Sequence, residues 1–438
     1  MIVINCLESN VDMSLPEAIF ERLSQARMEL AFTLLQRLIE VKAPASEVKN
    51  ILPKAWDTVR LYSTDIGSSI DGEGAEYYRT LLKILLLALR AHTAHTSDTS
   101  SRGSDSLQAS GSEGRSVQSA ASASPETLKI ALEILGTIVA RGFRSLTTAL
   151  HDNTSRVLPA DFALITAILR TLLSVPGIDR HTTQLISQFS EHQTARCASA
   201  LLSWSDQLAT NGDPIFGELS IFFLLELSSI PALAESLAVE GLLIHISNTN
   251  LVQNLRQARG MGPFDTPVRM FSIWSRGILP LYLNLLHAVG APIAVEISTA
   301  LNSFPGQLAR ASSNFDGKGP SPTDPAAGFI TLSMVSEAQT LAVISTVLDT
   351  FREAGASAGI IATDISEPKW DRAQIKEDIE NWMQRRASLR DKIVPTSEKE
   401  EAWARQQPLR PGSGADNRLE EKVVGELNGV LMLLSGGD

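Results

Sequence analysis

Residues 19–41, IFERLSQARMELAFTLLQRLIEV, contain the clearest helical pattern in this chain of 438 residues. Apolar side chains recur there at spacings of three and four, the period of one face of an α-helix. The residues of this stripe are Ile19, Leu23, Ala26, Leu30, Leu34, Leu38 and Val41. Ser14 and Glu17 have the spacing of a capping box, and Pro44 stops the pattern. We therefore predict a long helix that begins near Glu17 and buries this stripe.

The same period continues through the rest of the chain. A cluster of leucines between Tyr77 and Ala91 predicts a second helix. Four later helix starts are marked by a capping residue followed by proline, which lacks the amide that a first turn leaves unused. These starts are Ser124-Pro125, Asp213-Pro214, Thr266-Pro267 and Asp324-Pro325. We expect about fifteen helical segments, and no alternating run predicts a strand, so the expected fold class is all-α.

A loose repeat indicates how these helices are arranged. Helical blocks open at Pro159, Pro214, Pro267 and Pro325, at intervals of 55, 53 and 58 residues. The pattern favours an α-solenoid of irregular, HEAT- or armadillo-like stacked helices. Each layer of such an array contacts only its neighbours, so the molecule has a large surface with grooves that suit partner helices.

The chain divides into four regions by composition. Residues 1–92 are expected to form the N-terminal helices of the solenoid, and residues 93–124 a disordered Ser/Gly-rich insertion that is too polar to offset its ordering entropy. Residues 125–363 are the central helical stack, and residues 364–438 are amphipathic tail helices. A second polar loop is expected at residues 312–324.

Two amphipathic helices are predicted in the tail. The first carries apolar residues from Trp370 to Ile393 on one face, and the second runs from Leu419 to Leu434. On the second helix the candidate partner-binding residues are Leu427, Val430, Leu431 and Leu434. The alternative is that this face packs on the preceding helices as a cap, because most amphipathic faces point into a core.

Composition and motifs argue against several classes of function. The net charge of −11, with no dense basic cluster, disfavours direct binding of nucleic acid, and two cysteines cannot build a disulfide framework or a cysteine zinc site. The uncharged stretch from Gly277 to Val295 is broken by Pro280, Gly290 and Pro292, so we interpret it as core helices rather than a transmembrane segment. We expect no cofactor.

No sequence motif indicates catalysis. Neither a phosphate-binding loop nor a nucleophile elbow is present, and His92 and His95 have ligand spacing without a third ligand nearby. Cys197 follows Arg196, which could lower its pKa, but a small buried thiol is the simpler interpretation. We therefore expect a protein that is not an enzyme. An active site assembled only by folding is the remaining alternative.

Residues 262–271, GPFDTPVRMF, and their continuation WSRGILP at 274–280 resemble the C-terminal region of the giant α-helical nucleoporins of the nuclear pore inner ring. The closer resemblance is to the one-hundred-eighty-eight-kilodalton class in its fungal form. It implies a superhelical, karyopherin-like solenoid at the nuclear pore complex, and the Met start implies that a large N-terminal region precedes these residues in the full protein.

The resemblance also implies partners. The leading hypothesis is a structural scaffold segment of the inner ring that docks the amphipathic helix of a linker nucleoporin in a groove near the tail. The second is a karyopherin-like transport adaptor that binds Phe-Gly repeat nucleoporins through many weak contacts. Such an adaptor could also bind transport receptors, and it would take part in the transport of protein and mRNA.

Overall fold

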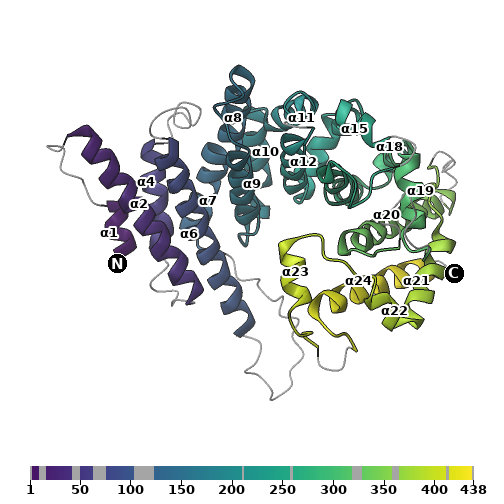
Figure 1. The fold of residues 1–438 in the computed structure, drawn as a ribbon. Coiled ribbons are helices and arrows are strands. Elements are labelled where there is room, and N and C mark those ends of the chain that lie inside the picture. The colour runs from purple at the N-terminus through teal and green to yellow at the C-terminus, as the bar shows by residue number, and fades with distance from the viewer. Residues whose placement is uncertain are drawn as a thin grey trace, which may run out of the picture. The chain divides into compact units, whose positions relative to one another are not determined.

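A computed structural model describes residues 2–8, 16–41, 50–62, 75–102, 123–209, 212–256, 260–317, 328–357, 365–410 and 414–436. These residues form α-helices with a few 3₁₀ and π turns, and no strand occurs among them. The nearest approach to a sheet is one parallel bridge between Ile330 and Ile393. The all-α prediction is confirmed, and the helices stack in the irregular manner of an α-solenoid (Figure 1).

The chain forms two compact units, residues 1–198 and 199–438. The division falls within the region predicted as one central stack, residues 125–363. The first unit contains α1 (Ile2–Glu8), α2 (Glu17–Glu40), α4 (Ile51–Tyr62), α6 (Ala75–Arg102), α7 (Pro125–Ile134), the π-helical η1 (Leu135–Ala140), α8 (Arg141–Asp152), α9 (Pro159–Leu173), the 3₁₀ turn η2 (Ile178–His181) and α10 (Thr182–Glu191). Helix α11 (Thr194–Trp204) contains the division.

The second unit is built around one long helix. Its elements are α12 (Ile215–Leu227), α13 (Pro231–Val239), α14 (Leu242–Ser247), α15 (Asn250–Leu255), α16 (Val268–Ser272), the π-helical η3 (Ile273–Ile278), α17 (Leu279–Val289), α18 (Ala291–Asn302), α19 (Pro305–Ser313), α20 (Leu332–Ser357), α21 (Arg372–Gln384), α22 (Arg386–Arg390), α23 (Glu398–Ala404) and α24 (Arg418–Ser435). Helix α20 contacts η3, α17, α18, α19 and α24, so it is the centre of this unit.

In the first unit, helices pack side by side and are joined by a buried ion pair. Helix α6 contacts α2, α4 and α9 (Figure 1). Asp161 on α9 accepts a hydrogen bond from the backbone amide of Leu158 at 2.9 Å, which caps α9, and Arg79 on α6 donates to the same carboxylate at 2.7 Å. This bond to Asp161 is the main reason that the pKa of Arg79 is raised. One carboxylate therefore both starts α9 and attaches it to α6.

The predicted helix over residues 17–41 is present, but its predicted stripe is covered only in part, at the half-buried Leu34 and at Leu38, which packs against Ala91. The buried residues of α2 are Met28, Ala31 and Leu35, which face α1 and α6, whereas Ile19, Leu23, Leu30 and Val41 are exposed. Both faces of α2 are apolar, and the small side chain of Ala31 lies on the face that is covered. Spacing alone does not distinguish two apolar faces. Ser14 lies outside the described residues.

Helix starts and breaks follow the prediction in part. Ser124 caps α7 by accepting from the amide of Thr127 at 3.2 Å, with Pro125 in the first turn as expected. Pro214 and Pro267 instead precede the first helical residue of α12 and α16, and Pro325 lies outside the described residues. The apolar stretch from Gly277 breaks at Gly290, as expected, where φ is +75° and the region favours glycine.

The polar insertions and the first tail helix differ from expectation. Helix α6 continues to Arg102, into the predicted 93–124 insertion, and residues 103–122 lie outside the described part of the chain. Most of the predicted loop at 312–324 lies outside it too. The single helix predicted from Trp370 to Ile393 is wrong, because Arg385 leaves the helical region at φ −111° and ψ 54° and separates α21 from α22. No glycine or proline marks this break.

Candidate docking site

Helix α24 is fixed in place at its start and along one side. Asn417 accepts a hydrogen bond from the amide of Glu420 at 2.9 Å, which caps the helix. Glu420 itself is buried, and its carboxylate accepts from Arg390 Nε at 3.0 Å and from the amide of Asp416 at 2.7 Å. The hydrogen bond to Glu420 is the first cause that raises the pKa of Arg390. Helix α24 therefore has a set position against α20, α21 and α23.

The four predicted partner-binding residues divide into two pairs. Leu427 and Val430 have no exposed surface, because they lie in the core between α24 and its neighbours. Leu431 and Leu434 are partly exposed in the last turns of the helix. Between them Met432 is 76% exposed. The first pair is therefore packed in the core, and only the second pair has exposed surface.

A groove lies beside α24 within the second unit. Its volume is about 1010 Å³, and it is open to solvent along part of its length. Part of its lining comes from the segment that contains α16 and η3, where Val268 is 56% exposed, and the rest comes from the start of α20, from α23 and from Glu426 of α24. Residues on the walls include Pro267, Val268, Phe271, Leu332, Trp403 and Glu426.

An ion-pair cluster stabilises the wall formed by α16 and η3. Arg269 Nε lies 2.9 Å from the carboxylate of Asp213, and its Nη1 pairs with Glu218. Burial lowers the pKa of Arg269, but the hydrogen bonds to the two carboxylates outweigh this effect and the pKa is raised. The guanidinium therefore stays charged and joins α16 to the start of α12.

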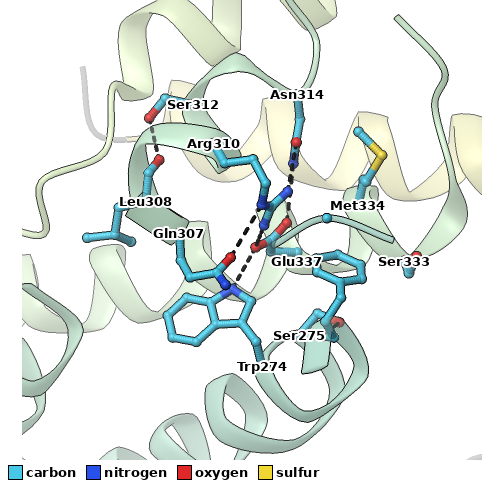
Figure 2. Close-up of polar contacts among 12 residues, drawn as sticks. Trp274, Ser275, Gln307, Leu308, Arg310, Ser312, Asn314, Ser333, Met334 and Glu337 are labelled. Carbon is cyan, nitrogen blue, oxygen red and sulfur yellow. Dashed lines mark hydrogen bonds and ion pairs between the residues drawn. The ribbon is translucent and has the colours of Figure 1, made fainter. Parts of the chain in front are cut away.

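A buried carboxylate supports the same wall from behind. Glu337 on α20 has no exposed surface, and it accepts hydrogen bonds from Trp274 of η3 and from Arg310 and Asn314 at the end of α19 (Figure 2). The Arg310 guanidinium also lies 4.9 Å from the ring centroid of Phe271, which lines the groove. Four elements are joined at this point, so the wall has a defined position.

Three cationic side chains gather around the indole of Trp403, which lines the groove together with Lys399. The ring of Trp403 has Lys422 Nζ at 4.6 Å, Lys399 Nζ at 5.0 Å and the guanidinium carbon of Arg418 at 5.6 Å from its centroid. Each distance is within the range of a cation–π interaction. We call these three residues and Trp403 the Trp403 cluster.

Comparison with known proteins identifies the family of the chain. The family model described as the nuclear pore protein NUP188 C-terminal domain matches residues 51–434. The chain belongs to this family. It is similar to nucleoporin NUP188 of Chaetomium thermophilum, with 35% identity over the whole chain and 24% of that protein, and to nup184 of Schizosaccharomyces pombe, with 24% identity over 68% of the chain and 18% of that protein.

The fold of the chain is also similar to a solved structure of this family. The chain resembles Nup188(aa1445-1827) from Myceliophthora thermophila with a TM-score of 0.68 and 35% identity, over 86% of this chain and 98% of that one. The chain spans about a quarter of the C. thermophilum relative. The family resemblance expected from residues 262–280 is confirmed, and the relatives that the chain matches are nucleoporins, which are components of the nuclear pore complex.

The sequence segment that indicated the NUP188 family forms part of the groove. Pro263, Thr266, Pro267, Val268, Arg269, Phe271, Ser275 and Arg276 all line it. Sequence reasoning missed the groove as a site, because part of its lining comes from α23 and α24, more than a hundred residues later. The helix α23 was not predicted at all.

The histidines and the cysteine considered in the sequence have ordinary surroundings where the structure describes them. His92 Nε2 lies 3.2 Å from Thr127 Oγ1, and the side chain of His95 is outside the described set. Burial raises the pKa of Cys197, although Arg144 lowers it in part. Within the described ranges, no group of three or more His, Cys, Asp or Glu side chains could hold a metal ion. No single described helix is long and apolar enough to cross a bilayer, although α9 together with the segment Ile178–Glu191, bent by 103°, meets the length and composition test.

Proposed function

We propose that this segment of the nuclear pore scaffold docks the amphipathic helix of a linker nucleoporin on the exposed end of α24, at Leu431 and Leu434. Leu427 and Val430 act in this proposal by holding α24 against the core. The helix of the partner would cover the apolar end and bury its own apolar stripe there.

The observation that carries the proposal is the run of four apolar residues at the end of α24. Leu431, Leu433 and Leu434 are partly exposed and Met432 is largely exposed, whereas the preceding apolar residues of the helix, such as Leu427 and Val430, are buried. Leu431 and Leu434 are three positions apart and so share one face of the helix, and apolar side chains left partly exposed on a fixed helix are typical of a protein–protein contact. Membership of a scaffold nucleoporin family supports the proposal, because a scaffold protein is expected to bind other nucleoporins.

The binding of Phe-Gly repeats is a second candidate, and a different patch favours it. Val239 at the end of α13 is 89% exposed and Ile244 on the adjacent α14 is 63% exposed. Two exposed aliphatic side chains on neighbouring helices can receive a phenylalanine ring, and many weak contacts of this kind would act together.

Binding measurements with the full chain separate the two candidates. The probes are a fluorescein-labelled peptide covering the linker nucleoporin's amphipathic helix and a labelled Phe-Gly repeat peptide, both read by fluorescence anisotropy. We expect Leu431→Asp/Leu434→Asp to weaken linker-peptide binding by at least about tenfold, because burying even one leucine contributes more than that factor. Val239→Asp/Ile244→Asp should leave linker binding unchanged and reduce Phe-Gly binding.

Two results would count against the proposal. The first is full linker-peptide affinity in Leu431→Asp/Leu434→Asp. The second is no linker binding by the wild-type chain at all. The milder pair Leu431→Ala/Leu434→Ala, with thermal unfolding curves for each variant, shows that any loss of binding is not a loss of folding.

A further inference from the structure

Helices α13 and α14 present two aliphatic side chains to solvent. Val239, the last residue of α13, is 89% exposed, which is the largest value among the large apolar side chains that the structure describes. Ile244 on α14 is 63% exposed, and the two helices are in contact. We call Val239 and Ile244 the α13–α14 patch. Two aliphatic side chains exposed to this extent on packed helices are a candidate contact surface.

Carboxylates flank the α13–α14 patch. Glu235 is four residues before Val239, so the two side chains share one face of α13, and Glu240 directly follows Val239. Both glutamates are exposed, and Glu240 accepts a hydrogen bond from Ser236 at 3.4 Å. In the part of the chain that the structure describes, neither carboxylate has an ion pair within 4 Å. The negative charge beside the patch is therefore not paired.

Helix α18, which contacts α14, has the same chemistry. Val295 is 39% exposed, and the exposed Glu296 follows it directly. At the end of α18, Asn302 accepts a hydrogen bond from the backbone amide of Lys369 at 2.9 Å. The same Asn302 donates to the carbonyl of Glu367, so the lysine at this end lies two residues from a further carboxylate. Helix α18 therefore adds no excess of positive charge.

The chain supplies no lysine or arginine from the helices that carry this surface. None occurs at residues 197–255, which include α12 to α15, or at residues 277–309, which include α17 and α18. The basic side chains on these helices are His245 and His287. Arg256, the first arginine after α15, is partly buried, and its guanidinium lies 5.3 Å from the centroid of an aromatic ring. The surface is thus both aliphatic and acidic.

We propose that the α13–α14 patch binds a basic segment of a partner protein. The apolar side chains of the segment cover Val239 and Ile244, and its lysines or arginines face Glu235 and Glu240. This inference rests on the second candidate function for the patch itself, and it adds a charge requirement: among Phe-Gly repeats, the patch selects those with basic spacers. Charge complementarity selects this occupant, because an acidic segment would meet carboxylates that no cation offsets.

Three labelled peptides test the charge requirement. They have equal length and equal Phe-Gly spacing, and their spacers carry Lys, Gln or Glu. Each is titrated into the full chain by fluorescence anisotropy. We expect the Lys peptide to bind at least about fivefold more tightly than the Gln peptide, because two or three exposed charge pairs together supply a factor of this size. The Glu peptide should bind more weakly than the Gln peptide, and the differences should shrink toward about 0.5 M salt, which screens exposed charges.

Matched variants assign the charge preference to the patch. Glu235→Gln/Glu240→Gln should lower the ratio between the affinities of the Lys and Gln peptides at least about twofold. The control Glu377→Gln/Glu380→Gln removes the same charge from two exposed carboxylates on α21 and should leave this ratio unchanged.

A neutral pair tests the aliphatic contact itself. Val239→Ser/Ile244→Ser removes both aliphatic side chains without adding charge, and it should weaken all three peptides at least about fivefold. Both side chains are largely exposed, so the melting temperature of this variant should match that of the wild type.

The outcomes separate this inference from the candidate function on which it rests. Equal binding of the three peptides, weakened in Val239→Ser/Ile244→Ser, would overturn the charge requirement and leave the patch as a docking surface. An unchanged Lys preference in Glu235→Gln/Glu240→Gln, or an equal loss in the control, would assign the preference to the net charge of the chain and overturn the inference. No binding of any peptide, or full binding by Val239→Ser/Ile244→Ser, would remove both.

Discussion

The indole nitrogen of Trp274 donates a hydrogen bond to Oε1 of Glu337 at 2.6 Å, and neither side chain is exposed to solvent (Figure 2). Arg310 and Asn314 bond to the same carboxylate. Glu337 therefore connects η3, α20 and the end of α19, and it sets the position of the groove wall that carries Phe271.

Glu337→Ala should destabilise the chain by about 3–5 kcal/mol, because removing one partner of a buried ion pair leaves the Arg310 guanidinium uncompensated. Urea unfolding followed by circular dichroism measures the change. Glu401→Ala removes a carboxylate from the exposed pair with Arg405 and should cost less than about 1 kcal/mol. Equal effects of the two variants would show that Glu337 does not hold the wall.

Substitution by alanine should lower the stability of the chain at one helical glycine and raise it at another. A Cβ at Gly277 in η3 would lie 2.7 Å from Ile221 Cγ2, so Gly277→Ala should cost about 1–3 kcal/mol through overpacking. A Cβ at Gly425 in α24 would meet nothing within 4 Å, so Gly425→Ala should stabilise by about 0.5–1 kcal/mol through helix propensity. Thermal unfolding of both variants tests the close approach of η3 and α12. If Gly277→Ala is more stable than the wild type, η3 and α12 do not approach each other this closely.

Alanine substitutions at Leu427 and Met432 of α24 should differ in their effect on stability, because Leu427 is packed in the core and Met432 is on the surface. Leu427→Ala should destabilise by about 2–5 kcal/mol, because it opens a cavity in the core. Met432→Ala should change stability by less than about 0.5 kcal/mol, since this side chain is largely exposed. Chemical denaturation gives both values. If Met432→Ala is the more damaging substitution, the assignment of the buried face of α24 is wrong.

The raised pKa of Glu426 predicts that its contribution to the stability of the chain depends on pH. Burial raises the pKa of its carboxyl in the folded chain, so the folded state binds this proton more tightly than the unfolded state. Its contribution to stability is full below the ordinary pKa of unfolded glutamate and is lost as the pH rises through the raised pKa. Glu426→Gln should therefore be more stable than wild type near about pH 7, by less than about 1 kcal/mol because the group is partly screened.

The measurement for Glu426 is the melting temperature of both proteins as a function of pH. The difference between them should shrink as the pH falls toward the ordinary glutamate pKa. A difference that is constant over this range would show that the titration of Glu426 is not its source.

The class of fold could be predicted from the sequence because helical period and capping signals are local. Ser124 and Thr127 show this, since the predicted cap is present as a hydrogen bond. Which face of a helix is buried is not a local property when both faces are apolar. Ile19 and Leu30 are exposed for this reason, and Ala31 is buried against α1 and α6.

The candidate sites depend on tertiary packing to a greater extent. The position of Leu427 in the core follows from the contact of α24 with α20, and the sequence left packing and docking open for it. Val268 and Trp403 line one groove although their segments are far apart in the chain. The break at Arg385 has no local signal, so it depends on how α21 and α22 pack.

The central claim is that a linker helix covers the exposed end of α24, and hydrogen exchange of the full chain with and without the linker peptide tests it most directly. The amides of residues 431–435 lie in a terminal turn that opens readily in the free chain, so bound peptide should slow their exchange strongly. We expect this protection at the end of α24 and none at α13 and α14. Protection elsewhere, with unchanged exchange over residues 431–435, would contradict the account.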